Sequence, residues 1–237
     1  MHFGIIAAGE GSRLAAEGVR ASKPLLPIGG EPMIERLIRI FKEAGAESIS
    51  IVASGRMPDV TARLEELKPQ LDIPLNIEVR TTPSSLHTFS ELCRMLPEKG
   101  RYIVTTVDTI FREEDFRRYV EAFREAPADV DGMMAVTDFI DDEKPLYVAT
   151  DANMRIKDFQ DAPEEGVKYV SGGIYGLDGK AKEVASRCLE RGVSRMRNFQ
   201  RALIEEGLSL KAFPMGKIVD VDHAADISGA EELIRKK

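Results

Sequence analysis

Long apolar runs and cysteine are both scarce in this 237-residue sequence. No segment approaches the roughly 20 consecutive apolar residues that a membrane-spanning helix needs, so we expect no membrane association. The apolar start, Phe3 to Ala8, is shorter than the hydrophobic part of a secretory leader and lacks a basic leader segment. We therefore expect a cytoplasmic location. The two cysteines, Cys93 and Cys188, lack metal-ligand spacing, which indicates reduced and packed thiols.

An excess of positive charge is also missing, because 33 Lys and Arg residues face 40 Asp and Glu residues, a net charge of -7. A negative molecule does not attract polyanions over long range, so we expect no nucleic-acid partner. Small phosphate ligands stay compatible with this charge. A few local Lys and Arg side chains, backbone N–H groups and a divalent cation can hold them.

Internal repeats, low-complexity tracts and linkers are absent as well. Hydrophobic residues make up 43% of the chain and charged residues 31%, which are ordinary values for a globular protein. A chain of this length fits one large α/β domain or two small ones, and no linker divides it. We therefore expect one domain over residues 1–237.

The first half of the chain alternates strand and helix patterns, which indicates parallel strands joined by helices. The second half has shorter strand patterns separated by Asp, Asn, Pro and Gly, which indicates a more antiparallel part. We divide the domain at residues 1–130 and 131–237. The expected strands are 2–8, 48–53, 75–80, 101–107, 133–137, 146–150, 155–159, 169–175, 208–213 and 218–221, and the expected helices are 33–44, 59–67, 85–96, 113–126, 179–190, 195–206 and 225–235.

A glycine-rich loop follows the first strand directly and reads Ala7-Ala8-Gly9-Glu10-Gly11-Ser12-Arg13-Leu14. Gly9 and Gly11 let the backbone approach phosphate oxygens without Cβ clashes, and adjacent N–H groups can converge on one anion. Arg13 adds a forked cationic donor that suits phosphate. The loop lacks the Gly-Lys-Ser/Thr of a Walker A motif and the third glycine of the dinucleotide fingerprint. On its own it is also compatible with an ordinary turn.

A second segment, Ser22-Lys23-Pro24-Leu25, follows shortly after this loop. The proline restrains Lys23, whose side chain could reach back to the same triphosphate. The alternative is a solvated loop lysine. The loop and Lys23 together are more specific than either alone.

With Gly30-Glu31-Pro32-Met33-Ile34 added, the sequence resembles the nucleotidyltransferase superfamily that includes sugar-1-phosphate nucleotidyltransferases and phosphocholine cytidylyltransferases. The family signature is a Gly-x-Gly-Ser/Thr-Arg-Leu loop, then Lys-Pro-Leu, then Gly-x-Pro-Leu/Met-Ile, and all three stand here in order. The resemblance implies a Rossmann-like, three-layer α/β/α fold of the GT-A-like type, with a mixed and predominantly parallel sheet. It also implies an NTP substrate and Mg²⁺. The implied nucleotide-binding residues are Ala8, Gly9, Gly11, Ser12, Arg13 and Lys23, of which Arg13 and Lys23 would be catalytic.

Three aspartates stand where the resemblance implies the metal ligands. Asp108 follows the fourth strand, at the sheet edge where open α/β folds bind ligands, although it could instead cap a turn. Asp220 and Asp222 alternate on a strand and so face one side, where two carboxylates repel unless a cation shares them. We expect Asp226 to lie in the first turn of the last helix and His223 to be structural or solvated.

The acceptor end of the site is less complete. The resemblance implies that Gly173 and Tyr175 line the acceptor pocket. Sugar-type relatives carry a Glu-Lys-Pro segment whose lysine contacts the acceptor phosphate, but Ala162 stands at that lysine position here. Lys157 or Lys168 could take its place.

Ser85 opens an expected helix, where the phosphocholine-type branch places a Ser-Leu pair beside the base. It could contact the base or ribose, and it could equally cap its own helix. We expect residues 1–130 to bind the NTP, and residues 131–237 to bind the acceptor and complete the metal site.

The implied reaction transfers an NMP from an NTP to a small phosphorylated acceptor, such as a sugar 1-phosphate or phosphocholine, and releases pyrophosphate. For sugar acceptors this belongs to NDP-sugar biosynthesis. Two alternatives stay open. One is a nucleotide-sugar-dependent glycosyltransferase with Asp220-Val221-Asp222 as its Asp-x-Asp motif, and the other is a regulatory nucleotide-binding module without turnover. A homo-oligomer is compatible with all three.

Overall fold

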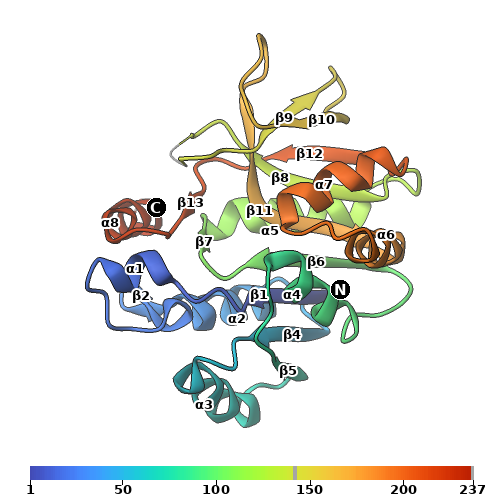
Figure 1. Ribbon diagram of the computed structural model, residues 1–237. Helices are drawn as coiled ribbons and strands as arrows, with labels where there is room; N and C mark the ends of the chain where they lie inside the picture. Colours follow the sequence, from blue (N-terminus) through green and yellow to red (C-terminus); the bar gives the residue numbers. More distant parts are fainter. Residues whose placement is uncertain (141–142, 236–237) are drawn as a thin grey trace.

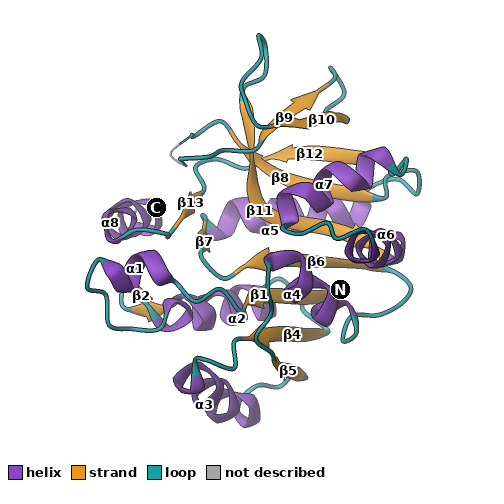
Figure 2. Ribbon diagram, viewed as in Figure 1, coloured by secondary structure: helices purple, strands orange, loops and turns teal. Residues whose placement is uncertain are grey.

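The computed structural model describes residues 1–140 and 143–235. Within these residues a nine-stranded sheet forms the centre, and helices cover both of its faces (Figures 1 and 2). The main strand order is β10-β9-β11-β6-β1-β4-β5, and β8 pairs with β11 and with β12. This confirms the expected three-layer α/β/α architecture.

The front half of the sheet is parallel. Its four strands are β1 (His2–Ala7), β4 (Ser48–Ala53), β5 (Leu75–Val79) and β6 (Arg101–Thr106). β1 pairs in parallel with both β4 and β6, and β4 with β5. The carboxyl ends of β1 and β6 therefore meet at one edge of the sheet, where the glycine-rich loop and Asp108 follow them.

The rear half is mostly antiparallel. It comprises β8 (Gly132–Thr137), β9 (Tyr147–Thr150), β10 (Ile156–Gln160), β11 (Tyr169–Asp178) and β12 (Leu210–Pro214). Because β11 runs antiparallel to β6, the first residues of β11 lie at the edge where β6 ends. This topology adds side chains from the rear half to the edge that carries the loop.

Two apolar layers hold the helices on the sheet. On one face, side chains of α2 (Met33–Glu43), α3 (Pro58–Leu67) and α5 (Glu113–Glu125) pack with Phe3, whose ring lies 4.7 Å from that of Phe41. The other face packs against α4 (Ser85–Cys93), α6 (Gly179–Glu190) and α7 (Met196–Glu205), where the rings of Phe89 and Phe199 are 5.0 Å apart. In both layers the helices pack on the sheet through apolar side chains that recur at helical spacing in the sequence.

Several short elements had no counterpart among the expected ones. They are α1 (Ser12–Ala16), the 3-10 turns Lys23–Leu25 and Lys68–Gln70, and the two-residue strands β2 (Pro27–Ile28), β3 (Glu31–Pro32) and β7 (Thr109–Ile110). β7 pairs antiparallel with β13 (Val219–Asp220), which is shorter than the expected strand 218–221. The last helix is α8 (Ala224–Arg235).

The expected helix 85–96 was too long, because α4 ends at Cys93. Lys182 of α6 donates to the backbone oxygens of Cys93 (2.8 Å) and Leu96 (2.6 Å). These carbonyl groups therefore have hydrogen-bond partners without a further helical turn. Cys93 and Cys188 are free thiols.

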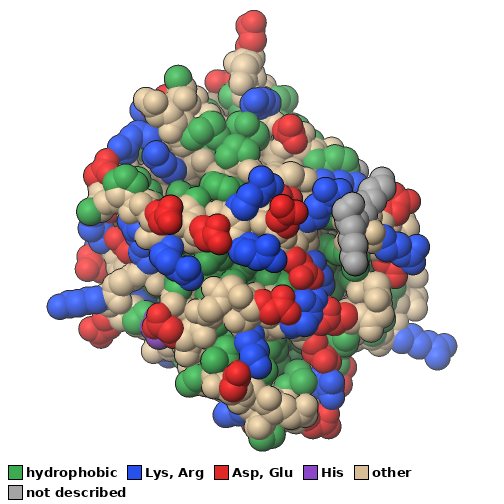
Figure 3. Space-filling model, turned by 180° about the vertical axis from the view of Figure 1, so that it is seen from behind, with side chains coloured by type: hydrophobic (Ala, Val, Ile, Leu, Met, Phe, Trp, Pro, Cys, Tyr) green, Lys and Arg blue, Asp and Glu red, His purple; other side chains and the backbone are tan. Residues whose placement is uncertain are grey.

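The last helix, α8, packs beside early segments of the chain at the edge of the sheet where β1 ends. Figure 1 shows α8 beside α1 and β2, although these segments stand at opposite ends of the sequence. Among the described residues, no helix has the length and apolar character that crossing a membrane demands. On the face drawn in Figure 3, acidic and basic side chains are interspersed.

Candidate active site

Two cavities adjoin at the edge where β1 and β6 end. The larger has a volume of about 510 Å³ and the smaller about 390 Å³. They share Pro83, Ser84, Ser85, Thr106 and Asp108 as lining residues. The predicted site residues distribute around both. The nucleotide-side residues Ala8, Gly9 and Lys23 line the smaller cavity, and Arg13, Gly173, Tyr175, Asp220 and Asp222 line the larger one.

The glycine-rich loop exposes its backbone to the smaller cavity at Gly9, where an added Cβ would meet no atom within 4 Å. Gly11 has a different role, because its φ is +62° and an added Cβ would lie 2.8 Å from the Cβ of Lys23. Only glycine lets the loop pack this closely on Lys23. Ser12 begins α1 on the exposed side and, like Gly11, does not line either cavity.

Lys23 is buried, with 7% of its side chain exposed, so it is not the solvated lysine of the alternative interpretation. Its Nζ lies 2.5 Å from Oδ2 of Asp108 and 2.6 Å from Oδ1 of Asp222. Burial alone would lower the pKa of Lys23. The charges of the two aspartates and their hydrogen bonds outweigh burial and raise this pKa above its usual value, so the ammonium stays charged.

Arg13 is the second cation of the site. Its Nη1 donates to Oδ2 of Asp222 at 2.9 Å, and its half-exposed guanidinium lines the larger cavity. Burial would raise the pKa of Asp222, but Lys23 and Arg13 together lower it below its usual value. The Asp222 carboxylate is therefore ionised and sits between two cations.

The two-stranded pairing of β7 with β13 brings the aspartates together. Asp220 stands opposite Thr109, and its Oδ1 accepts a hydrogen bond of 3.0 Å from the Thr109 hydroxyl. The backbone N–H of Val221 donates to the carbonyl of Asp108 at 3.1 Å. Asp220 and Asp222 both line the larger cavity, although β13 ends at Asp220 and Asp222 lies beyond the strand on which the sequence placed both.

Asp220 differs from Asp222 in the direction in which its pKa is shifted. Asp220 is open to the cleft, although protein atoms lie closely around its carboxylate. This burial raises the pKa of Asp220 to about 7, and the charge of Asp108 adds to the effect. A carboxylate of this kind gains from a cation that neutralises it.

The three aspartates offer only oxygen donors, which suits Mg²⁺. In the described part of the chain, no group of three His, Cys, Asp or Glu side chains is gathered closely enough to hold a metal unaided. Mg²⁺ does not need such a cage, because proteins bind it through one or two carboxylates, waters and substrate phosphates. The donor set therefore fits Mg²⁺ that arrives with a phosphorylated ligand.

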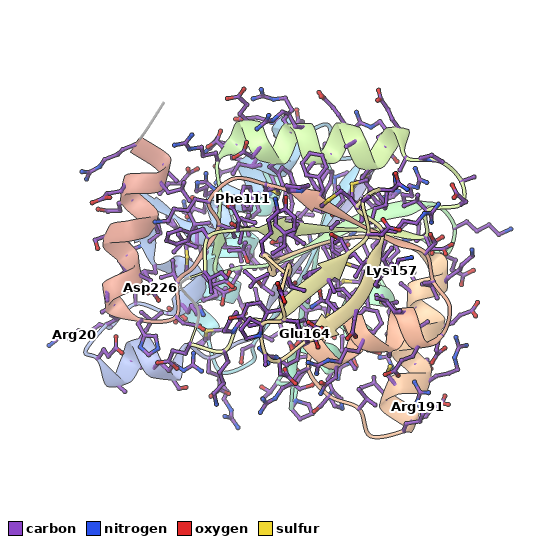
Figure 4. All side chains as sticks on the ribbon, turned by 90° about the horizontal axis from the view of Figure 1, so that it is seen from above. Arg20, Phe111, Lys157, Glu164, Arg191 and Asp226 are labelled. Carbon is purple, nitrogen blue, oxygen red and sulfur yellow. The ribbon has the colours of Figure 1, made fainter. Side chains whose placement is uncertain are left out.

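Asp226 and His223 hold the C-terminal segment in place. Oδ2 of Asp226, in the first turn of α8 (Figure 4), accepts from the backbone N–H groups of Asp222 (2.9 Å) and His223 (2.7 Å). Nδ1 of His223 lies 2.5 Å from Oε1 of Glu17, and Oε2 of Glu17 accepts from the N–H of Ala224 at 2.6 Å. Both residues therefore have the structural roles that the sequence predicted.

Gly173 and Tyr175 belong to an irregular part of β11, where its register against β8 shifts. Gly173 has a φ of +70°, and an added Cβ would lie 2.5 Å from Oγ1 of Thr109 and 3.1 Å from Oγ1 of Thr106. Bulges of this kind often border active sites, because they redirect the strand. Burial raises the pKa of Tyr175 above its usual value, so its phenol is neutral.

Ser85 lines both cavities, and its hydroxyl makes no capping hydrogen bond to α4, the helix that it opens. Its Oγ accepts from the backbone N–H of Met196 at 3.0 Å, and Oγ of Ser84 accepts from that of Arg195 at 3.3 Å. The two hydroxyls therefore fix the start of α7 against the start of α4. Ser85 therefore does not cap its own helix, as the sequence suggested, but binds the first N–H of α7, 111 positions further along the chain.

The sequence did not identify six polar residues of the larger cavity. They are Ser84, Thr106, Ser171, Arg195, Arg197 and Gln200. No motif surrounds them, and only the contact between α4 and α7 brings the last three to the cleft. Arg195 and Arg197 stand at the start of the expected helix 195–206, and this position is the sequence signal that could have indicated them.

The lysines considered for the acceptor side are not at the cleft. Nζ of Lys157 lies 3.3 Å from Asp151, and Nζ of Lys168 lies 4.9 Å from the ring centre of Tyr169. Neither lines the two cavities, and Figure 4 shows Lys157 well away from Asp226. Ala162 lines an outer cavity of about 770 Å³, which shares Arg195 and Arg197 with the larger cavity of the cleft.

The fold and the cleft together define a member of the nucleotidyltransferase superfamily. Residues 4–167, more than half of the chain, match the sequence profile of the MobA-like NTP transferase domain. The chain belongs to the family of MobA-like NTP transferase domains. The resemblance drawn from the loop, Lys23 and the aspartates is thereby confirmed at the level of the superfamily.

Among curated proteins, the chain is similar to the 2-aminoethylphosphonate cytidylyltransferase of Lancefieldella rimae, at 31% identity over 112 residues. That match spans 46% of this chain and only 44% of the relative. Two solved structures share the fold over nearly the whole chain. The inositol-1-phosphate CTP transferase from T. maritima has a TM-score of 0.81, 17% identity and coverage of 99% of this chain and 96% of its own. HddC from Yersinia pseudotuberculosis has a TM-score of 0.73, 20% identity and 98% coverage of both chains.

Proposed function

We propose that the protein is an Mg²⁺-dependent nucleotidyltransferase. It transfers an NMP from an NTP to a small phosphorylated acceptor and releases pyrophosphate. The observation that carries this proposal is Lys23, buried between Asp108 and Asp222 where two cavities adjoin. Two adjoining cavities with cations and carboxylates between them suit a reaction between two phosphorylated substrates.

The smaller cavity is the proposed NTP site. Its wall includes the open backbone at Gly9, which phosphate oxygens can approach, and the ammonium of Lys23. Ser85 lies on the same wall, within reach of a base or ribose. The larger cavity then accommodates the acceptor beyond the α-phosphate.

The charges at the junction also support this arrangement. Lys23 pairs with Asp108 and Asp222, and Arg13 pairs with Asp222, whereas Asp220 has no ion pair within the described chain. The junction therefore favours a further cation, and these three aspartates would hold Mg²⁺. When bound there, Mg²⁺ would neutralise charge on the triphosphate.

The protein side chains have limited chemical work in this reaction. An oxygen of the acceptor forms a bond to the α-phosphorus while the bond from that phosphorus to the pyrophosphate oxygen breaks. The acceptor is already an anion near neutral pH, so a general base is not needed. Alignment contributes up to roughly 7–11 kcal/mol in favourable cases. Arg13 and Lys23 stabilise the developing charge, and losing one such donor costs on the order of 3 kcal/mol.

The test is pyrophosphate release over a grid of NTPs and acceptors, with and without Mg²⁺. The acceptors are sugar 1-phosphates, phosphocholine and 2-aminoethylphosphonate, the last because a relative's name contains it. We expect Mg²⁺-dependent release with one acceptor class. Nucleotide binding without release from any pair would contradict the proposal and favour the regulatory module. Transfer from a nucleotide sugar would favour the glycosyltransferase.

Variants connect this activity to the site. Asp108→Ala and Lys23→Ala should each lower turnover by about 100-fold or more, because each removes a charge that faces the substrates. Lys157→Ala is the matched control, since Lys157 lies outside both cavities. Full turnover in either site variant would sink the assignment of these residues.

A further inference from the structure

The lining of the larger cavity includes two arginines besides Arg13 and the aspartates. Arg195 and Arg197, at the start of α7, line it together with Gln200 one turn later. Asp108, Asp220, Asp222 and Arg13 line the same cavity. A molecule that fills this cavity can therefore contact both the arginines of α7 and the aspartates.

Arg195 adopts a backbone conformation that is unusual for its residue type. Its φ is +70° and its ψ 143°, in a region populated mainly by glycine. Its N–H donates to the Ser84 hydroxyl, and the next N–H, of Met196, donates to the Ser85 hydroxyl. These contacts hold Arg195 at the cavity. Strain that neighbouring groups maintain is typical of functional positions.

The two arginines differ in how they are held. Arg197 is half-buried, and its guanidinium donates to Asp161 at 3.1 Å and to the carbonyl of Lys144 at 2.5 Å. Arg195 is exposed, and in residues 1–140 and 143–235 its guanidinium has no hydrogen bond or ion pair. One fixed and one unpaired guanidinium thus border the same space.

Gln200 adds a neutral hydrogen-bond donor to the same cavity. Only 2% of this residue is exposed, and its Oε1 accepts from the Ser171 hydroxyl at 2.8 Å. Its amide nitrogen has no hydrogen-bond partner within the described chain and is not one of the sealed atoms that lack one, so it opens to the cavity that the residue lines. An unpaired amide donor that opens to a cavity is available to an acceptor oxygen of a ligand there.

We propose that Arg195, Arg197 and Gln200 bind the tetrahedral oxyanion of the acceptor, a phosphate monoester or a phosphonate. This rests on the proposed function and names residues for the end of the site where Ala162 leaves no lysine. Two guanidinium groups and an amide donor match the several oxygens of such an anion. The acceptor is thereby oriented with an oxygen toward the nucleotide cavity.

Steady-state kinetics separate this role from a general one. Arg195→Gln and Arg197→Gln should each raise the KM of the acceptor about tenfold or more and leave the KM of the NTP nearly unchanged. Arg197→Lys should recover part of the loss, because lysine keeps the charge without the fork. Unchanged acceptor KM, or equal rises in both KM values, would overturn the proposal.

Arg201→Gln is the matched control. Arg201 lies one turn after Arg197 on the same helix but lines only the outer cavity, where it pairs with Asp161 at 2.7 Å. It should leave the acceptor KM unchanged. A rise equal to that of Arg197→Gln would attribute the effect to the helix or to Asp161 and would contradict the proposal.

A binding measurement tests the oxyanion site without turnover. Inorganic phosphate and methylphosphonate should each raise the thermal midpoint of the wild type and of Arg201→Gln, but not of the double variant Arg195→Gln/Arg197→Gln. Equal rises in all three proteins would overturn the proposal even if the wild type is active. If the wild type is inactive but only the double variant loses the rise in thermal midpoint, the oxyanion site is supported and the proposed function fails. Pyrophosphate release with methyl phosphate or with methylphosphonate as the acceptor then distinguishes a phosphate ester from a phosphonate.

Discussion

At Gly173 the absence of a side chain protects the hydroxyl that positions Asp220. An added Cβ would lie 2.5 Å from Oγ1 of Thr109, and this hydroxyl donates to Asp220. Gly173→Ala should therefore lower turnover by about tenfold or more while the protein stays folded. The measurement is pyrophosphate release together with the far-ultraviolet circular dichroism spectrum.

Gly166 offers a control for the backbone effect alone. Its φ is +83°, yet an added Cβ would meet no atom within 4 Å. Gly166→Ala and Gly173→Ala should both lose about 1 kcal/mol of stability from the unfavourable φ. Only Gly173→Ala should lose activity, and equal activity in the two variants would contradict the assigned role of Thr109.

Lys23 stabilises the free protein by neutralising Asp108 and Asp222. Lys23→Met should lower the free energy of unfolding by on the order of 2 kcal/mol, because it leaves two neighbouring carboxylates without their shared cation. Mg²⁺ should then raise the thermal midpoint more in the variant than in the wild type. Calorimetry at several Mg²⁺ concentrations measures both effects. Equal Mg²⁺ responses would argue against a metal at these aspartates.

Among the individual residues of the cleft, the sequence identified those that belong to motifs. Lys23, Asp108 and Asp220 were predicted from the chain alone, and the structure places all three around the adjoining cavities. Arg195 and Gln200 were not, because the hydroxyls of α4 bring them to the cleft over a long sequence separation. No local pattern encodes a contact of that kind.

Among the elements, α1 and α8 are joined by a contact that depends on charge. Glu17, just after α1, accepts from the N–H of Ala224, and its carboxylate lies beside His223. The hydrogen bond to Glu17 raises the pKa of His223 above its usual value. The resulting stability is present below the unfolded pKa and is lost as the pH rises through the raised value.

His223→Ala should therefore lower the urea midpoint most near about pH 6 and least near about pH 9. Glu17→Gln should remove most of this pH dependence, because the partner charge is gone. Denaturation curves of the three proteins at both pH values provide the measurement. A deficit in His223→Ala that grows with pH would show that the contact does not depend on the protonated imidazole.

The long elements were predictable and the shortest ones were not. α2 and α5 carry apolar residues at helical spacing over three turns, and their bounds agree with the sequence to within one residue. The two-residue pairing of β7 with β13 has no periodicity to detect, and it depends on residues far apart in the chain. The metal-side geometry follows from that pairing, so its detail was beyond the sequence.

Over the whole molecule, the two halves share one sheet. β11 of the rear half lies between β6 of the front half and β8, and it pairs with both. Residues 1–130 and 131–237 should therefore unfold together. We expect one thermal transition in which the calorimetric and van't Hoff enthalpies agree. Two transitions, or a front half that keeps its structure after the rear half melts, would show that the halves are separate domains.

The pairing of β13 with β7 also sets the moment during synthesis at which a complete site can exist. Thr109 and Asp220 are 111 positions apart, so at about 5–20 residues per second the ribosome adds the second roughly 5–20 s after the first. In that interval the nascent chain already contains the glycine-rich loop, Lys23 and Asp108. Chains that terminate prematurely within this stretch therefore keep the glycine-rich loop but cannot assemble all three carboxylates, and under the proposed function we expect them to release no pyrophosphate.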